Sequence, residues 1–508
     1  MSTRRAFLAR TAAIGLGATV LPAVGDATAT AVPQGEVDVE PRAAARHDLT
    51  ELTLAEAATL IRRGRLDPVD LLAAYLARIE AFDGTYQAFN LVRADAARDE
   101  ARAAARRGPL HGIPLAVKDN YFTAGVPTTA NSFLFADFVP PWDATAVARL
   151  TAAGGIVLGK TQMGPLATSR ATTPSGEVTT VNAWAPEDPS VYPGGSSTGS
   201  ATAVAGRLAT SSVGTQTGGS ITAPSNAQNL TGLKPTMGRV SLHGIVPLTH
   251  TRDHPGPLAR DTLDAAIMLS AMAGPDPADP RTLGLPPVPD LVTAATPVRR
   301  RDRARLRWPT RIGVIPGYAD GGARTAFLDT LADIPGARLV DVPLPAEWEL
   351  LTGRVFNDVR LPERSEPFLP HLRADLRGFG VSVLGWLRGA LLGSDEYLIG
   401  QRAKLVLLER VLTDLFDRCD VVVQTSPVPF DILGLPELAL PIGFDDDGLP
   451  LGTILGARPY EEDRLLAVGA AYQAVTDWHH RRPADPTRPA VRRTPPRLDA
   501  LDVLETMQ

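Results

Sequence analysis

The hydrophobic positions of the chain alternate between helical and strand-like spacing from about residue 50 onward. A capping-box pattern at Thr53 predicts one helix, and Asp67-Pro68 predicts the start of a second helix, which we expect Gly84 to end. Apolar runs predict buried strands at 113–117, 155–158, 312–315 and 421–423, and helical spacing predicts helices at 145–153, 200–208 and 402–416. This alternation predicts one large α/β domain.

Segments rich in Gly, Pro, Ser, Thr or Arg separate these elements. We expect a loop at 160–200 and a long surface excursion at 275–310, whereas 438–455 predicts a hairpin that turns at Asp446-Asp447-Gly448. The boundaries that follow are residues 30–47 for a polar linker, 48–480 for the domain and 481–508 for a poorly packed Pro/Arg-rich tail.

The first residues have the pattern of an export signal. Arg4-Arg5 followed by Phe7-Leu8 is typical of a twin-arginine signal. The uncharged stretch 11–25 is short for a membrane span, which takes about 20 residues. We therefore expect residues 1–29 to be a twin-arginine signal peptide that is cleaved near Ala29. The translocase would then be a transient partner and the mature protein extracytoplasmic; a frayed helix or a retained anchor is the alternative.

Composition excludes several classes of protein. The chain has 508 residues, of which 44% are hydrophobic and 21% are charged, as in a globular protein. Its formal net charge of -5 argues against a nucleic-acid partner. The single cysteine, Cys419, excludes an intrachain disulfide and a cysteine-based metal site. Lysine is scarce among the 51 basic residues and occurs only at positions 118, 160, 234 and 404.

Two Gly-Gly-Ser elements carry the first indication of chemistry. They lie at 194–196 and 218–220, so their serines are 24 residues apart. Glycines before a serine allow close approach of the backbone to a ligand, and the N–H groups of such a turn can stabilise a developing oxyanion. Either element alone is also compatible with a linker. A phosphate-binding loop is disfavoured because neither element ends in Gly-Lys-Ser/Thr.

Together with the segment GPLHGIPLAVKDN at 108–120, these elements resemble the amidase signature family. The resemblance continues in the short motifs GLKPT at 232–236, GRVS at 238–241, DHPGP at 253–257 and GLP at 434–436, and so covers about residues 50–480. It implies a single domain with a central mixed β-sheet flanked by helices. It also implies hydrolysis of a small-molecule or peptide amide without a metal or an organic cofactor.

The resemblance assigns a Ser–Ser–Lys triad. Ser220 aligns with the family nucleophile, Ser196 with the bridging serine on a cis peptide bond, and Lys118 with the general base. The backbone N–H groups of Thr217, Gly218, Gly219 and Ser220 would form the oxyanion hole. The chemistry of these residue types agrees with the assignment. A lysine can take the proton of a serine only when it is neutral, so burial at the end of the strand 113–117 must lower its pKa.

The chain departs from the family at two positions beside the nucleophile. Many members carry an aspartate four residues before it and an arginine two after it, whereas this chain has Gln216 and Thr222. Both charges are absent together, so no single buried charge loses its partner. Lys160 and Lys234 also lie in family-like segments, and we interpret both as structural.

Three alternatives stay open. Residues 195–199 fit G-x-S-x-G, the nucleophile elbow of esterases, with Ser197 as nucleophile, and His243, His250 or His254 could complete a triad. That motif needs a preceding strand, which residues 188–193 do not provide. The chain could also be a catalytically silent amide-binding protein, or resemble the amidase subunit of transfer-RNA transamidation, although export argues against the latter. The class of amide and the oligomeric state are not determined by the sequence.

Overall fold

The computed structural model describes residues 37–43, 48–104, 108–301, 303–319, 321–353, 358 and 360–487. The expected signal peptide at 1–29 and residues 488–508 of the expected tail lie outside this part of the chain, and both stay predictions.

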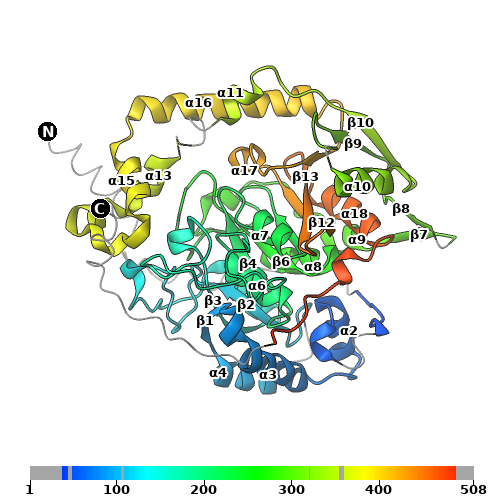
Figure 1. Cartoon of the computed structure of the whole chain (residues 1–508), viewed down its shortest axis with the longest axis horizontal. Helices are drawn as coiled ribbons and strands as arrows, with labels where there is room; N and C mark the ends of the chain where they lie inside the picture. The colour runs from blue at the N-terminus through cyan, green and yellow to red at the C-terminus, as the bar shows by residue number, and fades with distance from the viewer. Residues whose placement is uncertain are drawn as a thin grey trace.

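One mixed β-sheet forms the centre of the described structure (Figure 1). Its eleven strands follow the order β1-β3-β2-β4-β6-β5-β12-β13-β11-β9-β10. Their bounds are β1 Phe89–Val92, β2 Pro114–Lys118, β3 Ile156–Thr161, β4 Ser211–Gln216, β5 Thr231–Lys234, β6 His254–Ala259, β9 Thr310–Val314, β10 Ala337–Asp341, β11 Val421–Gln424, β12 Glu437–Phe444 and β13 Pro450–Ala457. β2 runs parallel to β3 and β4, whereas β6 runs antiparallel to β4 and β5. The expected α/β domain with a mixed sheet is confirmed.

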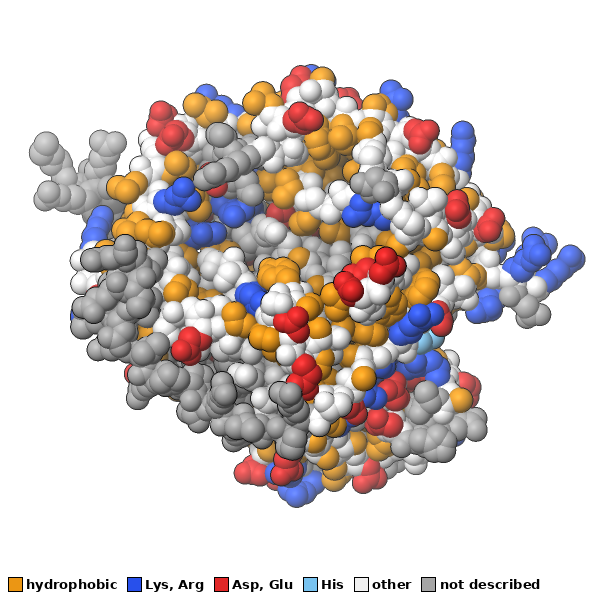
Figure 2. Space-filling model, viewed as in Figure 1, with side chains coloured by type: hydrophobic (Ala, Val, Ile, Leu, Met, Phe, Trp, Pro, Cys, Tyr) orange, Lys and Arg blue, Asp and Glu red, His pale blue; other side chains and the backbone are white. Residues whose placement is uncertain are grey.

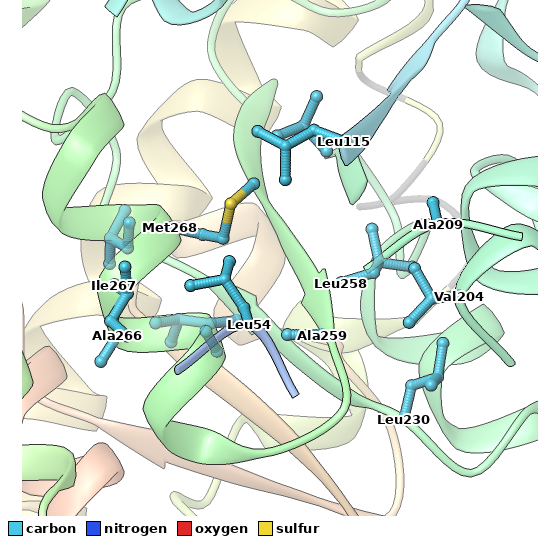
Figure 3. Packing of buried hydrophobic residues seen from close by; sticks show 14 of the residues in the cluster. Leu54, Leu115, Val204, Ala209, Leu230, Leu258, Ala259, Ala266, Ile267 and Met268 are labelled. Atoms are coloured by element: carbon cyan, nitrogen blue, oxygen red, sulfur yellow. The ribbon is translucent and has the colours of Figure 1, made fainter. Parts of the chain in front are cut away.

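Helices cover the sheet on both faces. They include α2 Leu54–Arg62, α3 Pro68–Tyr86, α5 Thr145–Ala152, α6 Thr198–Ala205, α7 Thr222–Ala227, α8 Thr262–Met272 and α18 Glu462–Gln473. Nearly every residue of α8 is buried because this helix contacts β5 and β6 on one side and α2, α5 and α18 on the others. Figure 3 shows Leu54, Leu115, Leu258 and Met268 gathered in this core.

A group of helices from the second half of the chain lies beside and above the sheet (Figure 1). It includes α13 Leu361–Ser365, α15 Val383–Leu391 and α16 Ser394–Arg410. In the part of the chain that the structure describes, no helix combines the length and apolarity needed to cross a bilayer.

The first helices follow the sequence pattern, with one exception. The capping box is present, since Thr53 Oγ1 accepts from Glu56 N at 3.2 Å and Thr53 N donates to Glu56 Oε2 at 2.9 Å. Gly84 does not end α3, contrary to our prediction. The helix continues to Tyr86, whose side chain is fully buried, and ends where Gln87 adopts a left-handed conformation with φ 49°. Burial of an aromatic side chain therefore outweighs the helix-ending tendency of the glycine.

Two further expectations need correction. The excursion at 275–310 is not wholly at the surface, because α9 Leu291–Ala295 buries four side chains against α8 and α18. The helix expected at 402–416 begins earlier, at Ser394, and passes into a π-helical turn after Arg410. The hairpin is confirmed, with β12 and β13 paired antiparallel.

Both ends of the described chain touch the domain. Arg42 Nε donates to Glu56 Oε1 at 3.1 Å, so part of the expected linker lies against α2. Asp485, in the expected tail, forms ion pairs with Arg78 and Arg207. The boundaries that we assigned to linker, domain and tail stay predictions.

Candidate active site

Lys118 is the last residue of β2 and is fully buried. Its Nζ donates to Ser196 Oγ at 2.8 Å and to Thr215 Oγ1 at 2.8 Å. Burial lowers the pKa of Lys118 from 10.5 to about 7, while the negative charge of Asp253 acts in the opposite direction. Near neutral pH the amine is therefore poised to lose and regain a proton, as a general base must.

Ser196 follows a cis peptide bond from Gly195 and lies just before α6. A Cβ atom at Gly195 would lie 2.6 Å from Ser169 O, so only glycine fits there. Gly194 has φ 77°, and a Cβ atom on it would lie 2.2 Å from Pro224 Cα in α7. The first Gly-Gly-Ser element therefore packs directly on the helix that follows the second one.

Ser220 lies in the turn between β4 and α7 and is half-buried, while Gly218 beside it is exposed. Within the described residues, no backbone hydrogen bond occupies the N–H groups of Gly218, Gly219 or Ser220. These donors are thus available to an oxyanion. No hydrogen bond joins the Ser220 hydroxyl to Ser196 in the described structure. The fold brings Lys118 and Ser196 into direct contact and places Ser220 on the adjoining segment.

Two residues that the sequence did not single out support this arrangement. Thr215 of β4 accepts a hydrogen bond from the Lys118 amine, as Ser196 does. Asp253 accepts a hydrogen bond from the Thr217 hydroxyl and from Leu248 N at 2.8 Å. Burial raises the pKa of Asp253 and these hydrogen bonds lower it. Asp253 lies in a family-like motif, but only its tertiary contact with Thr217 indicates a role.

Charged side chains border the nucleophile loop. A Cβ atom on Gly218 would lie 3.6 Å from Arg360 Nη1 and 3.8 Å from Asp431 Oδ2. Burial raises the pKa of Asp431 to about 6, although neighbouring cations lower it. Lys404 of α16 donates to Thr251 O at 3.0 Å. In Figure 2 the surface is hollowed below α16 and beside α13 and α15, with Lys and Arg side chains at its edge.

The esterase alternative finds no support in the geometry. The Ser197 hydroxyl is fully buried and donates to Thr215 O at 3.3 Å. The three candidate histidines make other contacts: His243 stacks on Trp142, His250 Nδ1 lies 3.3 Å from Arg281 Nη1, and His254 Nδ1 lies 2.6 Å from Arg252 O. Among the described residues, no His, Cys, Asp and Glu side chains form a group of three that could hold a metal ion.

Lys160 and Lys234, which we interpreted as structural, contact groups other than the two Gly-Gly-Ser serines. Lys160 Nζ donates to Tyr121 O and Thr128 Oγ1, both at 2.6 Å, and pairs with Asp119 at 3.3 Å. Lys234 donates to Leu435 O and lies 3.9 Å from a carboxylate oxygen of Glu437.

Comparison with known proteins agrees with the motifs. The chain matches the protein-family model described as Amidase over residues 70–353. A glutamyl-tRNA(Gln) amidotransferase subunit of Chloroflexus aurantiacus is 36% identical over 492 residues, covering 86% of this chain and 99% of that protein. The protein of the same name from Roseiflexus sp. is 37% identical over 490 residues, covering 86% and 98%.

The fold of the chain is also similar to that of a solved amidase structure. The native peptide amidase of Stenotrophomonas maltophilia matches with a TM-score of 0.72 and 30% identity, covering 83% of this chain and 96% of that one. The family match spans more than half of the chain, and the relatives align over nearly their whole length. The chain therefore belongs to the amidase signature family and is an enzyme that acts on amide C–N bonds.

Proposed function

We propose that this amidase hydrolyses a carboxamide through an acyl-enzyme on Ser220, with Ser196 and Lys118 as the proton relay. The contact between the buried Lys118 amine and Ser196 Oγ, at 2.8 Å, carries the proposal. A serine hydroxyl is a weak nucleophile without a base, and a buried lysine with a pKa of about 7 can serve as one.

In the first half-reaction, Ser220 Oγ bonds to the carbonyl carbon. Its proton passes to Ser196 Oγ, and the proton of Ser196 passes to neutral Lys118. The N–H groups of Thr217, Gly218, Gly219 and Ser220 stabilise the oxyanion. The proton then returns from Lys118 through Ser196 to the amide nitrogen, the C–N bond breaks, and the nitrogen leaves as ammonia or an amine. Water repeats the sequence at the ester, which releases the carboxylic acid and restores Ser220.

Phosphonate labelling tests this assignment. An alkyl fluorophosphonate should form an adduct on Ser220 that peptide mapping by mass spectrometry locates. Ser220→Ala should abolish both the adduct and ammonia release from a panel of primary amides. Ser196→Ala should leave only a trace of activity, because the oxyanion hole is still present. An adduct on Ser197 would instead establish the esterase-type elbow.

A second candidate function follows from the names of the relatives, which are amidotransferase subunits. In that case the chain would act with partner subunits. Ammonia release from the purified chain alone, at the native mass of this chain or its homo-oligomer, would support the stand-alone amidase. Activity only after addition of partner subunits would support the second candidate.

We also propose that the enzyme is exported by the twin-arginine translocase and acts outside the cytoplasm. The Arg4-Arg5 pattern with the small-residue site near Ala29 supports this. Arg4→Lys/Arg5→Lys should leave uncleaved precursor in the cytoplasm, whereas Arg10→Lys, outside the pair, should be exported normally. Equal export of both variants would overturn the proposal.

A further inference from the structure

Gln216, which stands where many family members carry an aspartate, closes the loop that bears the nucleophile. It is the last residue of β4 and is fully buried. Its Oε1 accepts hydrogen bonds from Ile221 N and Thr222 N, both at 3.0 Å, and from Thr222 Oγ1 at 3.2 Å. The backbone of Gln216 begins the loop 217–220 and its side chain binds the residues that end it. One side chain therefore fixes the distance across the loop.

The other end of this amide is anchored in the sheet. Gln216 Nε2 donates to Glu437 Oε2 at 2.9 Å. Glu437 is the fully buried first residue of β12 and is the register partner of Lys234 on β5. Burial raises the pKa of Glu437 well above its usual value, and the nearby charge of Lys234 offsets this only in part. The nucleophile loop is thus connected through two side chains to the central strands.

The two ends of the Gln216 amide are not interchangeable. The side facing the loop must accept hydrogen bonds from N–H groups, and the side facing Glu437 must donate one, so an amide satisfies both. A carboxylate at position 216 would accept from the loop equally well but would meet the Glu437 carboxylate at hydrogen-bond distance. Both groups cannot be ionised at this distance without a large cost, so one of them would have to take up a proton. Gln216 and Glu437 therefore fit each other as a pair.

We infer that Gln216 and Glu437 are positioning residues that hold the loop 217–220 in its reactive geometry, replacing the charged pair found in many family members. The inference rests on the proposed function of Ser220. Because a displacement of about 1 Å at reacting groups can cost about 100-fold in rate, the pair acts on turnover more than on substrate binding.

Exchanging the two side chains tests the inference. Gln216→Glu should lower kcat about 100-fold, as loss of one oxyanion donor does, with KM changed less than about threefold since substrate contacts are intact. Glu437→Gln in the same chain should restore kcat to within about tenfold of wild type, because the amide introduced on β12 can donate to the carboxylate introduced on β4. Gln216→Met, which lacks both polar atoms, should lose turnover without rescue by Glu437→Gln.

Gln473 provides a matched control for the burial of a charge. This buried glutamine also accepts from the N–H and hydroxyl of a threonine, Thr262, at 2.8 and 2.7 Å, and donates to Thr231 at 3.0 Å. Gln473→Glu should lower Tm with kcat of the folded enzyme unchanged. If Gln216→Glu behaves in the same way, the role of Gln216 is only structural and the inference is overturned.

The outcomes separate this inference from the proposed function. Retained hydrolysis in Ser220→Ala overturns the proposed function whatever the exchange variants do. An inactive Ser220→Ala together with no recovery in the Gln216→Glu/Glu437→Gln enzyme overturns only the positioning pair. Should Gln216→Glu fail to fold, an active exchanged enzyme beside an inactive, folded Gln216→Met still supports the inference, and an inactive exchanged enzyme overturns it.

Discussion

Lys118 on β2 and Lys160 on β3 are neighbours in one sheet, yet their surroundings differ in one decisive respect. Both side chains are fully buried, and burial lowers the pKa of both. Lys160 has the Asp119 carboxylate at 3.3 Å, which raises its pKa again to about 8. Lys118 hydrogen-bonds only to hydroxyl and carbonyl oxygens of Ser196 and Thr215 in the described structure, and its pKa is about 7. The difference lies in the contacts: Lys160 is held in an ion pair, whereas Lys118 contacts the Ser196 hydroxyl, with which an amine can exchange a proton.

The largest expected effect distinguishes proton transfer from charge at Lys118. Lys118→Ala should lower kcat/KM about 1,000-fold or more, in the range that general-base catalysis contributes. Lys118→Arg should be nearly as damaging, because arginine keeps the charge but cannot lose its proton near neutral pH. The measurement is kcat/KM on a small amide, with circular dichroism to verify folding. Activity close to wild type in Lys118→Arg would refute the neutral-lysine mechanism.

Removal of the Lys160 amine and removal of the Lys118 amine should change the free energy of unfolding in opposite directions. Lys160→Met leaves Asp119 buried without its cation and should cost about 3–5 kcal/mol of the free energy of unfolding. Lys118→Met leaves no carboxylate in contact unpaired and should gain roughly 1–3 kcal/mol at pH 6, because it removes a buried amine that is costly to charge. Denaturant titration of both variants measures the difference, and equal losses would show that the two lysines are energetically alike.

The pH dependence sharpens the same comparison. Activity needs neutral Lys118, so kcat/KM should rise with pH through about 7.

The lowered pKa of Lys118 also makes stability depend on pH. The unfolded chain binds more protons than the folded chain between about pH 7 and 10.5. The stability contribution of Lys118 therefore improves as pH rises across this window, and the advantage of Lys118→Met should shrink from pH 6 to pH 9. An advantage that does not change with pH would contradict the lowered pKa.

Ser197→Ala should have the smallest effect. Among the described residues, the Ser197 hydroxyl exchanges hydrogen bonds with the backbone of Thr215 alone, so its loss should cost about 1 kcal/mol of stability. We expect kcat/KM within about threefold of wild type, because no interaction with the reacting atoms is removed. Complete loss of activity in this variant would show that Ser197, not Ser196, belongs to the reactive pair.

Local pattern was sufficient for most of the elements around the site. The capping box at Thr53 and the hairpin at 438–455 depend on neighbouring residues, and both are present. The end of α3 is different, because the burial of Tyr86 depends on what packs against it and outweighs the local preference of Gly84. The length of α16 and the burial of α9 within the excursion were missed for the same reason: each depends on contacts with distant segments.

For the site, the sequence by itself determined which residues are candidates. The two Gly-Gly-Ser elements indicate a close approach of the backbone to a ligand, and the resemblance to the amidase signature family assigns Lys118, Ser196 and Ser220 as the triad. Only the tertiary structure decided which buried lysine lacks a carboxylate, and it added Thr215, Asp253 and Glu437 to the site. Glu437 is 221 residues from Gln216, so no local pattern connects them. β6 and β5 lie between β4 and β12 in the sheet, so the contact between the two side chains depends on the order of the strands, which is a property of the whole fold.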